Sequence, residues 1–202
     1  MAERFRRRAA DPLHWGSNPH PGFNGGCLHD LVRVHENYGI FNYHYCLPNF
    51  SEVITLRMLF MHCESFEYIT TTPTRLAEPV DDRCKRCQVR DAMVVFATVE
   101  HMDECAIHEV AYRSCAEILS MINRIGKKVI VLFPFSHLSN DLADPKFANK
   151  VLDEIQNCLN RLGYTVYKAP FGWEKKFSLT CKGHPLAQAL RVINHSNKRG
   201  LD

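Results

Sequence analysis

The sequence lacks the long apolar run that a membrane-spanning helix requires. Such a helix needs about 20 apolar residues, whereas the segment 129–133 (VIVLF) has only the length of a buried strand. Several enzyme signatures are also missing, because no P-loop, dinucleotide fingerprint, nucleophile elbow or Ser-His-Asp order occurs. These absences argue against a membrane partner, against nucleotide-dependent enzymes of those classes and against a serine triad.

Signs of disulfides and metal sites are weak although the chain has nine cysteines. The number is odd and no secretory signal precedes them, so free thiols in a reducing, cytoplasmic setting are expected. Cys84 and Cys87 form one tight pair, and a structural zinc site usually needs two such pairs. A loop with two free thiols is therefore favoured over zinc, and no metal or cofactor is expected.

Positive charge is concentrated near the end of the chain, although the net charge is only +3. From residue 168 to residue 202 there are seven lysines and arginines against two acids. A basic face of this kind suits a protein that binds a phosphate backbone, and Lys182 and Arg191 are the candidate phosphate contacts. A solvated, frayed C-terminus would explain the same excess of charge.

The hydrophobic pattern divides the chain into three parts. Residues 1–52 are rich in glycine, proline, asparagine and histidine and show no period of 2 or 3.6, which predicts a flexible extension. The arginines near its start suggest a mitochondrial transit peptide, but interrupting acids and scarce serine argue against one. A folded domain is expected over 53–195, followed by a tail over 196–202.

The folded part is predicted to be one α/β domain. Strands and helices are expected in this order: strands over 53–62, 66–72 and 92–100, a helix over 105–125, a strand over 127–135, a helix over 145–162, strands over 164–169 and 176–181, and a short helix over 185–194. Gly126 suits the end of the first helix and Asp144 the N-cap of the second. A loop is expected over 73–90. Strands alternating with helices after an opening hairpin predict a mixed sheet packed by helices.

Two loops carry side chains suited to chemistry. The stretch 133–141 follows the central strand, and ligands of α/β sheets bind at the carboxyl ends of strands. His137 in this loop suits a general base, and capping of local backbone would explain it equally well. The loop at 169–176 carries Lys175, which could stabilise an oxyanion or hold a phosphate, although most lysines only solvate a surface.

Both loops also carry motifs of a known family. The motifs are FPFSHLS at 133–139, APFGWEK at 169–175 and CKGHPLAQ at 181–188, with LRMLFMHCESFEY at 56–68 and AMVVFATVE at 92–100. Together they resemble the N-terminal editing domain of archaeal-type threonyl-tRNA synthetases over about 55–195. The long motifs are too specific for chance to be a good explanation.

The resemblance implies a fold shared with D-aminoacyl-tRNA deacylases, usually as a homodimer. It implies an aminoacyl-tRNA deacylase that hydrolyses serine wrongly esterified to tRNA(Thr), with the 2′-OH of the terminal ribose helping to activate water. Threonine differs from serine by one methyl group, which a binding pocket discriminates by only about 1–3 kcal/mol. A second, hydrolytic site that removes serine would overcome this limit. The implied partners are seryl-tRNA(Thr) and, for a freestanding module, a separate threonyl-tRNA synthetase.

Site residues follow from the resemblance position by position. Lys175 matches the catalytic lysine, His137 the active-site histidine, and Gln188 a glutamate that contributes to catalysis. Matches to the aminoacyl and adenosine pocket, with the glycine of the same motif, are Pro134, Val99, Phe171, Gly172, Trp173 and Glu174. Glu174 replaces the usual tyrosine. This change and Gln188 keep two alternatives open: a catalytically weakened module that binds tRNA or a synthetase, and a deacylase of shifted aminoacyl specificity.

The resemblance also gives two geometric expectations. The turn at 170–173 should form the mouth of a pocket and place Lys175 toward His137 across neighbouring strand ends. Gln188 should be able to accept a hydrogen bond from the Lys175 ammonium, although an amide cannot pair its charge.

Overall fold

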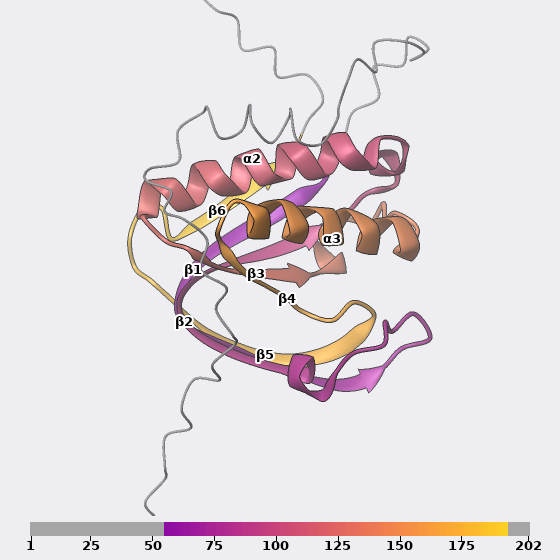
Figure 1. The fold of residues 1–202 in the computed structure, drawn as a ribbon, viewed down its shortest axis with the longest axis horizontal. Helices are drawn as coiled ribbons and strands as arrows, with labels where there is room; N and C mark the ends of the chain where they lie inside the picture. The colour runs from indigo at the N-terminus through magenta and orange to yellow at the C-terminus, as the bar shows by residue number, and fades with distance from the viewer. Residues whose placement is uncertain (1–54, 194–202) are drawn as a thin grey trace, which may run out of the picture.

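The computed structural model describes residues 55–193, which carry a six-stranded mixed sheet and two α-helices (Figure 1). The expected extension over 1–52, the expected domain start at 53 and the tail over 196–202 lie outside the described residues. In chain order the elements are β1 (Arg57–Pro73), η1 (Asp82–Lys85), β2 (Arg86–Thr98), η2 (His101–Ala106), α2 (Ile107–Ile125), β3 (Val129–Pro134), η3 (Ser136–Leu138), α3 (Pro145–Arg161), β4 (Thr165–Lys168), β5 (Trp173–Cys181) and β6 (Gln188–Val192).

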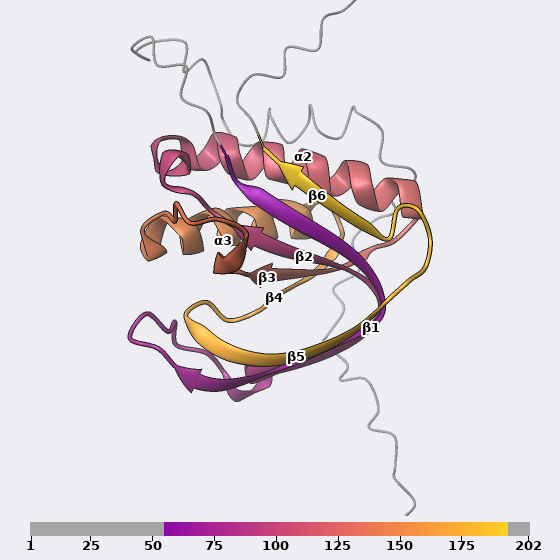
Figure 2. The same cartoon turned by 180° about the vertical axis from the view of Figure 1, so that it is seen from behind.

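The strands are ordered β4-β3-β2-β1-β5, and β6 pairs with the other half of β1. β1 is antiparallel to β2, β5 and β6, whereas β3 is parallel to both β2 and β4. Figure 2 shows β6 and β5 following each other along β1. The predicted α/β domain with a mixed sheet packed by helices is therefore confirmed. Within the described residues no helix is long and apolar enough to span a membrane.

Three of the predicted assignments were wrong because of pairing between distant segments, apart from shifts of a few residues at other element ends. The strands predicted over 53–62 and 66–72 are the single strand β1, because a bulge at the exposed Glu64 absorbs the break in alternation. Part of the loop predicted over 73–90 belongs to β2, whose charged start pairs with β1. Within the segment predicted as a helix over 185–194, the structure has the strand β6, which pairs antiparallel with the N-terminal part of β1.

The predicted C-terminal end of the first helix and the predicted N-cap of the second are confirmed. α2 ends at Gly126, which has a φ of 67° and donates its N–H to Asn123 O. α3 begins after Asp144, whose carboxylate accepts from the N–H of Lys146 at 2.9 Å, with Pro145 in the first turn. The cap at Asp144 fixes where α3 starts, and that start forms one wall of the cavity described below.

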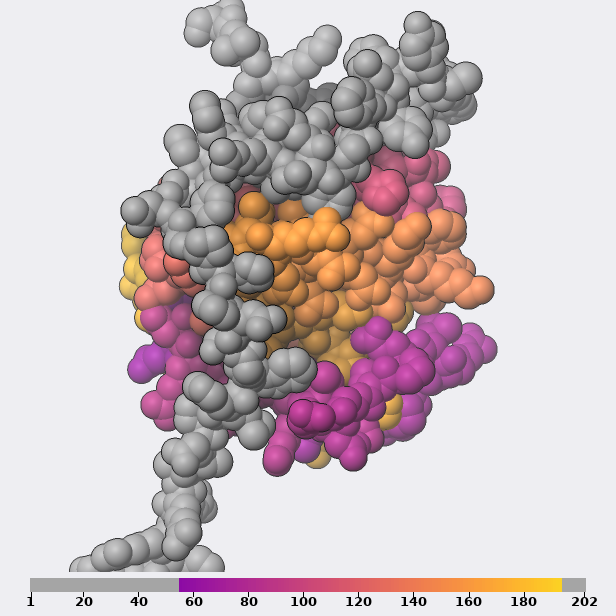
Figure 3. Space-filling view, viewed as in Figure 1, coloured from indigo at the N-terminus to yellow at the C-terminus, as the bar shows by residue number. Residues whose placement is uncertain are grey.

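The core has two parts, one on each face of the sheet. The larger part fills the space between the sheet and both helices, which lie on the same face (Figure 1). The smaller part is rich in aromatic side chains and lies on the other face, where Phe66, Phe96 and Phe133 contact one another edge to face or tilted. In the space-filling view the surface of α3 lies above that of the segment around η1 (Figure 3).

Candidate functional site

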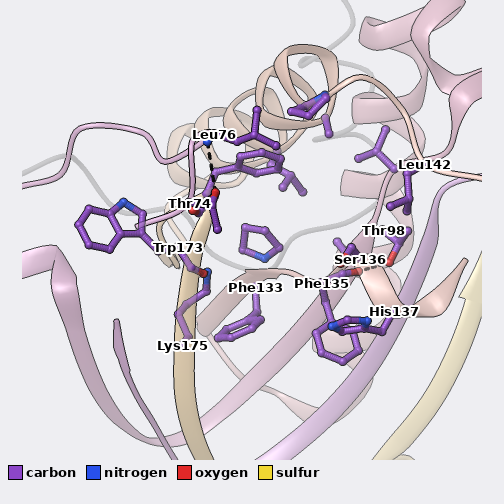
Figure 4. A pocket seen from close by; sticks show the side chains of 18 of the residues that line it. Thr74, Leu76, Thr98, Phe133, Phe135, Ser136, His137, Leu142, Trp173 and Lys175 are labelled. Atoms are coloured by element: carbon purple, nitrogen blue, oxygen red, sulfur yellow. Dashed lines mark hydrogen bonds between the residues drawn. The ribbon is translucent and has the colours of Figure 1, made fainter. Parts of the chain in front are cut away.

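A cavity of about 570 Å³ opens at the carboxyl ends of the parallel strands β2 and β3. Its walls come from η3, the start of α3, the segment after β1 and the turn before β5 (Figure 4). The predicted site residues that line it are Lys175, His137, Pro134, Val99, Phe171, Gly172, Trp173 and Glu174. Residues predicted from two separate loops thus meet in one cavity, as expected for an α/β sheet.

The turn before β5 is built on Gly172. This residue has a φ of 72°, and a Cβ atom there would lie 2.2 Å from the carbonyl oxygen of Leu76. The segment after β1 is pressed against the turn, because the N–H of Thr74 donates to Gly172 O at 3.0 Å and the N–H of Glu78 to Phe171 O at 3.1 Å. A glycine is therefore required for both its conformation and its close approach.

The carboxylate of Glu78 binds the same turn. One oxygen accepts from the N–H of Phe171 at 2.8 Å, and the other accepts from Asn149 at 3.0 Å and from Lys168 at 3.2 Å. The indole N–H of Trp173 donates to the backbone oxygen of Glu78 at 2.9 Å. Glu78 is not among the residues predicted from the sequence, because it lies in a segment expected to be a loop and these partners are 71 to 95 residues away.

Lys175 is the partly buried cation of the cavity. Its ammonium donates to the carbonyl oxygens of Pro170 at 2.7 Å and Trp173 at 2.6 Å, and lies 5.3 Å from the centre of the Phe133 ring. Burial lowers the pKa of Lys175 to about 8, and the negative charge of Glu78 opposes this effect. At neutral pH the ammonium is thus mostly protonated, and it loses its proton at lower pH than an ordinary lysine does.

His137 lines the cavity from η3. The rings of Phe133 and Phe135 lie between Lys175 and this histidine (Figure 4). Its side chain is exposed, and its ring packs edge-on against Phe135 with centroids 5.0 Å apart. Within residues 55–193 no hydrogen bond fixes this ring. Lys175 and His137 therefore face one cavity, and His137 is free to contact a ligand that enters it.

The comparisons with known proteins cover the stretch that forms this cavity. The family model described as the archaea-specific editing domain of threonyl-tRNA synthetase matches residues 56–193. The chain belongs to this family. Threonine–tRNA ligases of Methanococcoides burtonii and Methanosphaerula palustris are 38% and 39% identical to it over 138 and 139 residues. These alignments cover 68% of this chain and 22% of each ligase, so the chain spans a small part of its curated relatives.

One solved structure, a probable eukaryotic D-amino acid tRNA deacylase, is similar to this editing domain with a TM-score of 0.47 and 10% sequence identity. The match covers 69% of this chain and 100% of that one.

Gln188 lies outside the cavity of this editing domain. It is the first residue of β6, pairs with Met61 of β1, and donates from its amide to the sulfur of Cys181 at 3.5 Å. The expected hydrogen bond from Lys175 to Gln188 is therefore not formed, because β5 and β6 pair with different halves of β1. Glu174, the other departure from the family pattern, is exposed at the cavity rim.

The two predicted phosphate contacts are both paired with acids. Lys182 donates to Asp91, which also accepts from Lys127, and Arg191 donates to Glu117 at 2.9 Å. The hydrogen bonds from these lysines hold the pKa of Asp91 well below its usual range. A phosphate would therefore compete with existing partners at both positions, and their contact with tRNA stays a prediction.

Within the described residues no group of three or more histidines, cysteines or acids could hold a metal ion. Cys84 and Cys87 are free thiols at the junction of η1 and β2, and burial raises the pKa of Cys87 to about 11.

Proposed function

We propose that the cavity hydrolyses the ester of a mischarged tRNA, with seryl-tRNA(Thr) as the substrate. The observation that carries this proposal is the Lys175 ammonium, which two backbone carbonyls hold at the cavity wall of a domain from the threonyl-tRNA synthetase editing family. Fixed donors in a partly desolvated site favour the charge that develops on an ester oxygen.

In this mechanism water attacks the carbonyl carbon of the ester. The bond between that carbon and the ribose oxygen breaks, a proton passes to the ribose oxygen, and free serine and uncharged tRNA leave. The resemblance assigns activation of water to the neighbouring ribose hydroxyl. Thr74 and Thr98 also line the cavity, but their hydroxyl protons are donated to the backbone oxygens of Gly172 and Phe135. These two hydroxyls are therefore not assigned a role in activating the water. Lys175 then donates to the developing oxyanion, and His137 orients the ester or the water from the opposite side.

The alternative is a module that binds tRNA or a synthetase without hydrolysis. Gln188 was one of the two residues that supported this alternative. Gln188 does not line the cavity, so an amide in place of a carboxylate there leaves the charge of the cavity unchanged, and the support is weaker. Glu174 remains at the rim, where it bears on which aminoacyl group enters. The deciding experiment incubates the protein with seryl-tRNA(Thr) and threonyl-tRNA(Thr) and follows both esters. We expect the seryl ester to be lost faster; decay of both at the buffer rate would leave the binding module.

We also propose that the protein acts in the cytoplasm as a homodimer, alone or with a threonyl-tRNA synthetase. The family resemblance supports the homodimer, and β6 offers a surface for it. Leu190 and Val192 are 53% and 39% exposed, next to the partly buried Leu59 on the paired strand. Light scattering on the wild type and on Leu190→Glu tests this surface: we expect a dimer that the substitution dissociates, and a monomeric wild type would contradict it.

A further inference from the structure

Glu78 joins the turn before β5 to residues of β4 and α3. On one side its carboxylate and backbone bind both Phe171 and Trp173, the residues that flank Gly172. On the other side it contacts Lys168 at the end of β4 and Asn149 of α3. The turn before β5 is thus tied through one side chain to a strand and a helix.

Lys168, the partner of Glu78 on β4, is itself held by several contacts. The side chain of Lys168 is only 9% exposed, and its ammonium also donates to Asn149 at 2.7 Å and to Asp153 at 2.6 Å. A nearly buried cation with three oxygen partners is costly to move, because breaking the set would leave charge without compensation. Glu78 is therefore anchored, and a displacement of its carboxylate would be passed to the turn.

We propose that Glu78 is a positioning residue for the Lys175 ammonium, acting through the turn at 170–173. The two carbonyls that accept from this ammonium belong to Pro170 and Trp173, which bracket the backbone that Glu78 binds. This inference rests on the proposed function for its catalytic meaning.

The charge of Glu78 adds a second effect, since it favours the protonated form of Lys175 against burial. Other titratable side chains lie around the cavity: Glu174 is exposed next to Lys175 on β5, Lys85 of η1 lies over the ring of Trp173, and His137 faces the cavity from η3. Unlike Glu174 and His137, Glu78 also forms hydrogen bonds to the turn within residues 55–193, through Phe171 and Trp173. Removing its charge should therefore lower the pKa of Lys175.

The test compares Glu78→Gln and Glu78→Ala with the control Asp153→Asn. The control removes another carboxylate partner of Lys168, one that does not bind the turn. Two quantities are measured in each variant: the pH profile of seryl-tRNA(Thr) hydrolysis, and the pH dependence of Lys175 acetylation by acetic anhydride, followed by mass spectrometry. The second readout needs no enzymatic activity.

In Glu78→Gln, which keeps an acceptor for Phe171, the midpoints of both profiles should move to lower pH. In Glu78→Ala the hydrolysis rate should fall roughly 100-fold, as for other small misplacements of a catalytic group. Asp153→Asn should leave both profiles in place. Unmoved midpoints in Glu78→Gln, or an equal shift in Asp153→Asn, would overturn the proposal. If the wild type does not hydrolyse the ester, the proposed function fails, and the acetylation midpoint still decides the role of Glu78.

Discussion

Replacing Gly172 by alanine should damage the site more than any comparable glycine substitution in the domain. At its φ of 72° an alanine costs about 1–2 kcal/mol in backbone strain alone. Its Cβ would also lie 2.2 Å from Leu76 O and 2.7 Å from the Cα of Ala77, both backbone atoms. The turn and the segment after β1 must separate by roughly 1 Å to restore van der Waals contact.

Two other glycines among the described residues separate strain from clash. Gly163 has a φ of 84° with nothing within 4 Å of an added Cβ, so Gly163→Ala carries strain without a clash. Gly183 has open space and no left-handed conformation, so Gly183→Ala should carry neither. Urea unfolding should rank the losses of stability as Gly172, then Gly163, then Gly183, with about 1–3 kcal/mol for the first.

Hydrolysis of seryl-tRNA(Thr) should be lost in Gly172→Ala alone. A shift of about 1 Å at a catalytic group can reduce the rate by up to about 100-fold, and Lys175 is held by carbonyls on both sides of this glycine. Gly163→Ala should retain the wild-type rate despite its lower stability. A Gly172→Ala variant as active and as stable as Gly183→Ala would contradict the requirement for glycine at this turn.

The pH profile gives a further test: the rate above background hydrolysis should fall as pH rises through about 8, where Lys175 loses its proton. Because the folded pKa lies below the ordinary value of 10.5, the unfolded chain binds more protons between these values, so the contribution of Lys175 to stability should rise with pH while activity falls. Gln188→Glu should leave hydrolysis unchanged, since the side chain lies outside the cavity; a large gain in rate would restore its catalytic assignment. Lys182→Glu and Arg191→Glu should weaken binding of all tRNAs equally and reduce its salt dependence, and unchanged affinity would contradict the phosphate contacts.

Local chemistry explains what the sequence could predict. The caps at Gly126 and Asp144 and the glycine turn before β5 depend on neighbouring residues, so their places could be inferred correctly. Pairing between distant segments could not be inferred in the same way. β6 is a strand because it pairs with the part of β1 that β5 does not reach, and no local sequence pattern shows that this part of β1 is available. Glu78 belongs to the site through partners far along the chain, so only the fold reveals it.

The most direct test of the central claim compares Lys175→Ala with Lys176→Ala on seryl-tRNA(Thr). The two lysines are adjacent on β5, but Lys176 is exposed and does not line the cavity, so it controls for charge and strand position. Removal of one oxyanion donor reduces turnover by about 100- to 1000-fold in other enzymes. We expect a loss of this size in Lys175→Ala and the wild-type rate in Lys176→Ala, with both proteins folded. Equal rates in the two variants would contradict catalysis by the Lys175 ammonium.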